Sequence, residues 1–181
     1  MISHRNIIAN VLQYTTYESV ARKKLGVNTQ VMLGLLPYSH IYGLVVVTHG
    51  GQYRGDAVVV LPRYELDTFL AAVQRFRIQH LPVVPPIVIQ ILRNPDKCRR
   101  YDLKSVRFVY TGAAPLGAET AEDLKKAYPK WTIGQAYGRC SLIFLFTILL
   151  VSVRLFMGRA CLCVCLYYVW ETGCEQRCDR G

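Results

Sequence analysis

The stretch Val106–Gly138 decides the fold, and it reads VRFVYTGAAPLG, then AETAEDLKKAYPK, then WTIGQAYG. Val106, Phe108 and Tyr110 alternate with other side chains in a short β-rich run that stops at Gly112. A buried strand typically ends in this way, where it enters a turn of small residues. Such a turn would let a flat ligand lie against bare backbone.

A predicted helix and a second predicted strand follow that turn. Residues 118–127 are helix formers, with acidic side chains in the first turns, lysines in the last and Pro129 as a stop. The second β-rich run, Trp131–Ile133, ends in the small-residue segment Gly134–Gly138. Because parallel strands end at the same edge of a sheet, an α/β fold with a ligand crevice at this edge is predicted.

Strands and helices are also expected to alternate through the rest of the chain. Ser3 is a plausible N-cap for a helix that includes residues 7–12. Residues 66, 69, 70, 73 and 76 are apolar at helical spacing, which predicts an amphipathic helix. The expected strands are 31–36, 57–61 and 80–84, and the other expected helices are 44–48, 65–77 and 87–92.

Composition excludes some classes of protein. The chain has 181 residues, 52% hydrophobic and 19% charged, which argues against disorder and suits one domain or part of a larger one. The net charge of +10 is spread over helix faces and loops. No nucleic-acid motif accompanies it, so we expect a solvated surface and no nucleic-acid partner.

Four motifs in the first 138 residues resemble consecutive motifs of the AMP-forming acyl-CoA ligases, nearest the coumarate–CoA ligase and luciferase branch. They are PYSHIYG at 37–43, VPP at 84–86, TGAAPLG at 111–117 and QAYG at 135–138. Their order and rough spacing both match. The resemblance implies an incomplete N-terminal domain of an adenylate-forming enzyme over residues 1–138, followed by a hydrophobic tail of unrelated composition over residues 139–181.

The resemblance also implies a two-step reaction. A carboxylate attacks the α-phosphate of Mg-ATP to give an acyl-adenylate, and the thiol of CoA then displaces AMP. ATP or AMP, magnesium and CoA are therefore the implied cofactors, and a small carboxylic acid and an adenine nucleotide are the implied partners. Enzymes of this family are expected in the cytoplasm or in peroxisomes.

The implied site residues are carried over from the matching motifs. For the adenine of AMP they are Gly112, Ala113, Ala114, Gln135, Ala136 and Tyr137, with the tyrosine stacking on the ring. For the acyl pocket they are His40, Ile41, Tyr42, Val83, Tyr110, Gly112, Ala113 and Gly138. No catalytic residue and no metal ligand is implied within this chain.

Several of these residues have a packing interpretation as well. His40 before an apolar helix, Val83 before two prolines and Tyr137 at a strand end would each be an ordinary core or surface residue without the motifs around them. His4 is better explained as a helix-start residue than as a phosphate contact. The nature of the acid also stays open, because Val45 stands where coumarate ligases commonly place an asparagine.

The chain departs from the family pattern at three points. The phosphate-binding loop that precedes the Ser-His-Arg-Asn segment is absent, and Arg139-Cys140-Ser141 stands where a Thr and a Glu serve the phosphates and magnesium. Nothing downstream resembles the domain with the catalytic lysine. Each missing group would contribute to stabilising the transition state, so we expect little or no ligase activity from this chain alone.

The tail admits three interpretations. Residues 141–157 are apolar apart from Arg154, which allows one membrane span, although such a helix needs about 20 apolar residues. Six of the seven cysteines follow residue 138, but their spacing fits no standard zinc pattern. Alternatively, the tail is translated non-coding sequence beyond an exon end. Three hypotheses for the whole chain therefore remain: part of an enzyme of this family, a non-catalytic membrane-attached or regulatory fragment, or a truncated gene product.

Overall fold

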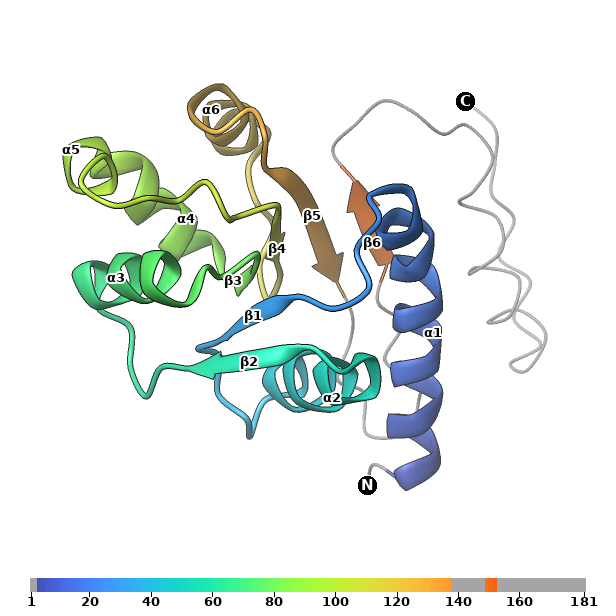
Figure 1. The fold of residues 1–181 in the computed structure, drawn as a ribbon. Helices are drawn as coiled ribbons and strands as arrows, with labels where there is room; N and C mark the ends of the chain where they lie inside the picture. Colours follow the sequence, from blue (N-terminus) through green and yellow to red (C-terminus); the bar gives the residue numbers. More distant parts are fainter. Residues whose placement is uncertain (1–2, 138–148, 153–181) are drawn as a thin grey trace, which may run out of the picture.

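The computed structural model describes residues 3–137 and 149–152, and its centre is a six-stranded sheet (Figure 1). The strand order is β2-β1-β3-β4-β5-β6. The first five strands are parallel and β6 is antiparallel to β5. The strands are β1 Val31–Gly34, β2 Ala57–Val60, β3 His80–Val83, β4 Phe108–Thr111, β5 Thr132–Tyr137 and β6 Leu149–Ser152.

Helices cover both faces of this sheet, as parallel strands joined by helical crossovers require (Figure 1). One face carries α1 His4–Lys24, η1 Tyr42–His49 and α2 Gly50–Arg54. The opposite face carries α3 Leu66–Phe76, α4 Pro85–Arg93, α5 Pro95–Cys98 and α6 Ala118–Ala127. The α/β fold expected from the sequence is confirmed.

The two faces of the sheet differ in chemistry because side chains alternate along each strand. Leu81, Val109 and Ile133 point towards α3, α4 and α6 and belong to one large apolar core. On the neighbouring positions of the same strands, His80 and Phe108 form an aromatic contact on the other face. The α1 face is therefore packed with aromatic and polar groups as well as aliphatic ones.

Local sequence signals explain most of the helix boundaries. Ser3 caps α1: its hydroxyl accepts from the Asn6 amide, and the Asn6 side chain accepts from the Ser3 amide. The helix α4 begins at Pro85, whose missing N–H is no loss at a first helical position. The short helix α5 follows in the polar segment after α4, and its Cys98 is buried.

The strand β5 is longer than the sequence suggested. Gly134–Tyr137 was expected to be a small-residue loop, but these residues continue the strand. Two ladders hold them extended, since Gln135 lies opposite Thr111 of β4 and Tyr137 lies opposite Leu149 of β6. That interpretation of the motif as a turn was therefore wrong.

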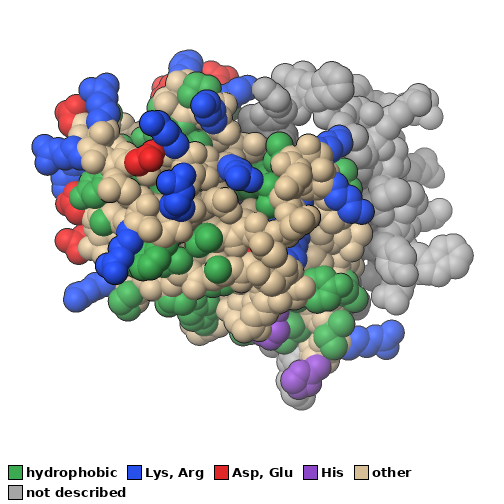
Figure 2. All heavy atoms as spheres, in the orientation of Figure 1, with side chains coloured by type: hydrophobic (Ala, Val, Ile, Leu, Met, Phe, Trp, Pro, Cys, Tyr) green, Lys and Arg blue, Asp and Glu red, His purple; other side chains and the backbone are tan. Residues whose placement is uncertain are grey.

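The strand β6 lies inside the apolar run 141–157 that was considered as a membrane span. Among the helices of the described residues, none is both long and apolar enough to cross a bilayer. The late cysteines lie outside the described residues. On the face shown in Figure 2, Lys and Arg side chains are scattered and do not form one basic patch.

The sheet reverses its winding between β1 and β3. The crossover from β1 leads outward to β2 through η1 and α2, whereas the crossover from β2 returns through α3 on the other face to β3. Ligands of open α/β sheets bind outside the carboxyl ends of strands at such a reversal. The loops after β1 and β3, at residues 35–41 and 84, are thereby brought to the same place as the loop after β4.

Candidate functional site at the carboxyl edge of the sheet

The loop after β1 is a tight turn that places His40 and Tyr42. The His40 amide donates to the carbonyl of Pro37 at 3.0 Å, and the Tyr42 amide donates to His40 Nδ1 at 3.1 Å. A Cβ at Gly43 would lie 2.3 Å from the Pro37 carbonyl oxygen, so only glycine allows this close approach. The imidazole of His40 is exposed, while Ile41 is half-buried.

Two residues predicted for the acyl pocket meet across the α1 face of the sheet. The hydroxyl of Tyr42 donates to the backbone carbonyl of Tyr110 at 3.2 Å. Burial raises the pKa of Tyr42, whose side chain is only 5% exposed, so this phenol stays protonated and able to donate. The contact joins the start of η1 to the end of β4.

The ring of Tyr110 is held from two further sides. It packs edge-on against the imidazole of His80, with ring centroids 4.7 Å apart. A Cβ at Gly134 would lie 2.2 Å from Tyr110 Cε1, so the ring occupies the space that this glycine leaves open on β5. Burial raises the pKa of Tyr110, and its phenol also stays neutral.

The loop after β4 carries the Gly-Ala-Ala segment predicted to lie against adenine. Gly112 is buried, whereas Ala113 and Ala114 are exposed. Ala113 has a φ of 69°, in the left-handed region that a residue with a Cβ rarely adopts. The Nε2 of Gln135 donates to the carbonyl of Leu116 at 3.1 Å, which ties this loop to β5.

The remaining predicted residues divide into two groups. Val83 is fully buried within the apolar core on the α3–α6 face, which supports the packing interpretation that the sequence left open. Ala136 and Tyr137 follow Gln135 on β5, where only their backbone is described. Gly138 and Arg139-Cys140-Ser141 lie outside the described residues. The roles of all these residues in binding stay predictions.

Comparison with protein families identifies the family of this chain. The family described as AMP-binding enzyme matches residues 1–148. The chain belongs to this family. The match reaches ten residues beyond the motif 135–138, whereas alignments with curated relatives span 137–139 residues.

The following curated relatives are acyl-CoA ligases. It is 41% identical over 138 residues to the acyl-CoA ligase lcsD of Purpureocillium lilacinum, covering 76% of this chain and 35% of that protein. It is 42% identical to the acyl-CoA ligase easD of Emericella nidulans, covering 76% and 24%. It is 36% identical to 4-coumarate–CoA ligase 2 of Nicotiana tabacum, covering 76% and 25%. The chain thus spans about a quarter to a third of these relatives.

Solved structures show the same fold. The ATP-bound RpMatB-BxBclM chimera B1 matches with a TM-score of 0.60 and 22% identity, covering 75% of this chain and 25% of that one. The luciferase-like enzyme from the mealworm Zophobas morio matches with a TM-score of 0.60 and 21% identity, covering 81% and 32%. At this identity the likeness concerns the fold alone.

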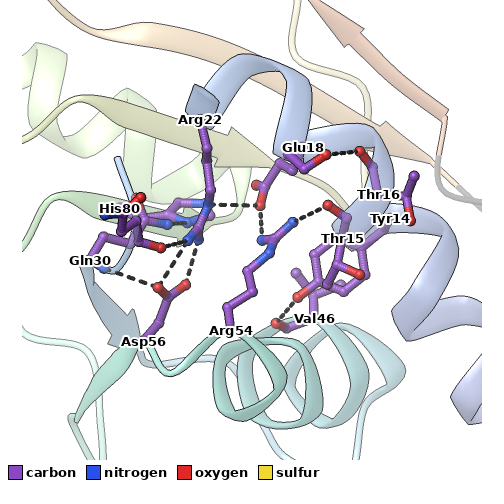
Figure 3. A network of polar contacts seen from close by, with 12 residues as sticks. Tyr14, Thr15, Thr16, Glu18, Arg22, Gln30, Val46, Arg54, Asp56 and His80 are labelled. Atoms are coloured by element: carbon purple, nitrogen blue, oxygen red, sulfur yellow. Dashed lines mark hydrogen bonds and ion pairs between the residues drawn. The ribbon is translucent and has the colours of Figure 1, made fainter. Parts of the chain in front are cut away.

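A buried ionic network lies away from this edge, on the α1 face (Figure 3). Arg22 of α1 donates to the carboxylate of Asp56, with Nη1 at 2.9 Å from Oδ1, and Arg54 forms an ion pair with Glu18. The Asp56 carboxylate also accepts a hydrogen bond from the backbone N–H of Gln30 at 3.0 Å. Gln30 and Asp56 directly precede β1 and β2, so the network sits at the amino ends of the strands.

His80, at the start of β3, extends this network. Its Nδ1 lies 2.8 Å from Gln30 Nε2, and since an amide nitrogen donates, Nδ1 accepts and the ring is neutral with its proton on Nε2. Burial, followed by the charges of Arg22 and Arg54, lowers the pKa of His80 to about 3. Sequence analysis missed this network; the only signal was Glu18 four residues before Arg22 on one helix.

The hydroxyl of Thr111 permits a test of packing beside the site. Thr111 is 1% exposed, and its Oγ1 has no hydrogen-bond partner within the part of the chain that the structure describes. Thr111→Val keeps the shape and removes the unpaired hydroxyl, so we expect the free energy of unfolding to stay equal or rise by up to about 1–2 kcal/mol. Urea denaturation would measure it.

Thr111→Ala is the matched control, because it removes the hydroxyl and also leaves a methyl-sized gap. We expect it to lower the free energy of unfolding by about 1 kcal/mol relative to Thr111→Val. A valine variant clearly less stable than the unmodified chain would show that the hydroxyl has a partner that stabilises it.

Proposed function

We propose that this chain supplies the adenine-facing and acyl-facing part of an ATP-dependent acyl-CoA ligase, and that the 181 residues alone do not complete the reaction. One observation carries the proposal. The loop 112–117 is joined to β5 by Gln135, and the adjoining end of β4 is joined to η1 by Tyr42, so both predicted subsites share one edge of the sheet.

The adenine subsite is the exposed backbone of Ala113 and Ala114 beside the end of β5. Two methyl side chains leave a low surface on which a flat ring can lie, and the aromatic ring predicted to cover its other side belongs to Tyr137. Neighbouring backbone amides can also hydrogen-bond the ring edge. The loop therefore fits a purine better than it fits a charged group.

The acyl subsite is the edge formed by His40, Tyr42 and Tyr110. The phenol of Tyr42 is buried and already committed to a backbone carbonyl, so this side offers an acid no free donor from that phenol. Such a lining suits an apolar aromatic or a medium to long aliphatic acid. Val45, which is fully buried, adds no polar group.

Charge neutralisation is the part of the chemistry that these residues do not supply. Displacement at a phosphate depends on groups that stabilise its developing negative charge. The Thr and Glu that the resemblance assigns to the phosphates and magnesium are replaced in the sequence by Arg139-Cys140-Ser141, so we propose that this chain lacks that part of the site. The division at residue 138 stays a proposal, with the tail taking no part in catalysis. CoA binding is assigned to the longer parent enzyme.

A non-catalytic membrane attachment through residues 141–157 is the competing proposal. It requires that segment to be one helix across the bilayer. The strand β6 lies within the segment and pairs with β5, which favours a part of the ligase domain over a membrane span. A cytoplasmic or peroxisomal location is proposed for the parent enzyme only.

Nucleotide binding by the 181-residue chain tests the proposal. We expect calorimetric titration to detect saturable AMP binding, with CMP binding about tenfold more weakly because its ring is smaller. Ala114→Trp places a large side chain on the exposed loop and should abolish AMP binding, whereas Ala71→Trp, at an exposed position of α3, should not. Equal binding of AMP by both variants would contradict the adenine subsite.

The expected lack of ligase activity in the 181-residue chain is tested separately. We expect no AMP release when the chain is supplied with ATP, magnesium, CoA and an aromatic or fatty acid. Turnover at a rate typical of enzymes, about 1 per second or more, would contradict it.

A further inference from the structure

We infer that Gln135 is a positioning residue, whose carboxamide nitrogen holds the loop 112–117 in the shape that receives adenine. The inference rests on the proposed adenine subsite. It assigns Gln135 a task beyond the direct adenine contact that the motif resemblance implied.

The first support is the double anchoring of Leu116. Its carbonyl accepts from Gln135 Nε2 at 3.1 Å, while its side chain, 6% exposed, is buried in the apolar core with Leu124 of α6 and Ile133 of β5. The backbone of Leu116 is thus held by Gln135, and its side chain is held by the apolar core. The end of the loop cannot shift without breaking one of these anchors.

The second support is where Gln135 stands on its strand. It lies directly opposite Thr111 in the β4–β5 ladder, and Thr111 is the last residue before the loop. The backbone of Gln135 therefore aligns the beginning of the loop, and its side chain fixes the end at Leu116. A single residue closes the loop at both ends.

The third support is the conformation that lies between those two ends. Ala113 has a φ of 69°, which is unfavourable for any residue with a Cβ. A residue stays in that region only where its surroundings determine it. Releasing the end of the loop would let Ala113 relax to a negative φ, and the flat surface formed with Ala114 would be lost.

Positioning and direct recognition can be separated by comparing two nucleotides, because the contact with Leu116 occupies only the carboxamide nitrogen and leaves Oε1 free to accept from a ligand. A side chain that hydrogen-bonds the 6-amino group of adenine would favour AMP over inosine monophosphate, which carries an oxygen there. A side chain whose amide holds Leu116 affects both nucleotides equally. The ratio of the two affinities therefore separates the two roles.

The test compares the full 181-residue chain with Gln135→Met, which keeps the length of the side chain and removes the donor. Thr132→Val, at an exposed position on the same strand, is the matched control. Two quantities are measured: amide hydrogen exchange within residues 112–117, and the dissociation constants of AMP and inosine monophosphate by titration. Amide exchange at Leu81 and Val109 reports whether each variant keeps its core.

We expect Gln135→Met to speed amide exchange in the loop by about fivefold to tenfold. We also expect it to raise the dissociation constants of AMP and inosine monophosphate by one common factor of about the same size. Thr132→Val should change none of these values. Loss of AMP affinity without loss of inosine monophosphate affinity would overturn the inference, because it would show direct recognition.

Unchanged loop exchange in Gln135→Met would also overturn it. If the unmodified chain binds neither nucleotide, the proposed adenine subsite fails, and loop exchange alone then supports or overturns the anchoring of the loop by Gln135. The two failures are therefore distinguishable.

Discussion

Asp56→Ala is expected to lower the free energy of unfolding by about 3–5 kcal/mol, because it leaves the buried guanidinium of Arg22 with only Glu18, 3.6 Å away and shared with Arg54. The Asp56 side chain is 0% exposed and that of Arg22 only 7%. The substitution also removes the acceptor of the Gln30 amide. Urea denaturation of the full chain, followed by circular dichroism, would measure the loss.

Asp96→Ala is the control for this prediction, because it breaks an ion pair at the surface. Asp96 and Arg99 are 85% and 79% exposed, and water screens their interaction. We expect a change below about 0.5 kcal/mol. If the two aspartate variants lost equal stability, the buried network would contribute no more than a surface pair.

Stability is expected to fall as the pH drops from 7 to 5, with His80 contributing about 2 kcal/mol of the loss. Its pKa is about 3 in the folded chain, against 6.5 for an ordinary histidine. Between these values the unfolded chain binds more protons, so acid favours unfolding. The contribution is complete above pH 6.5 and is lost progressively as the pH falls towards 3.

The comparison variant is His80→Asn, whose side-chain oxygen can still accept from Gln30 Nε2 but does not titrate. The quantity compared is the slope of unfolding free energy against pH, because the smaller asparagine will itself reduce stability. A shallower slope is expected for the variant over pH 5–7. Identical slopes would show that His80 is already protonated in the fold or is accessible to water.

Periodicity in the sequence predicted the elements whose causes are local. The helix 118–127 was predicted at its observed bounds, since acidic residues, lysines and Pro129 mark both ends. The cap at Ser3 is confirmed. The start of α4 at Pro85, two residues early, follows from the tolerance of a first helical turn for proline.

Features that depend on residues far apart in the chain escaped prediction. The extension of β5 to Tyr137 requires pairing with β6, and no local signal in a Gly-Gln-Ala-Tyr segment reports such a partner. The partnership of Arg54 with Glu18 spans 36 positions and needs the folded arrangement of α1 and α2. The motif resemblance named Gln135, but only the structure shows its contact with Leu116.

The two sides of the sheet should diverge in different ways among related sequences. Aliphatic residues such as Leu124 and Val109 can be exchanged one at a time for others of similar volume. Arg22 and Asp56 cannot, because a lone substitution strands a charge. Among relatives these two positions should be retained or replaced together. Paired substitutions are therefore expected in the layer beneath α1, and independent single substitutions in the apolar core on the opposite face of the sheet.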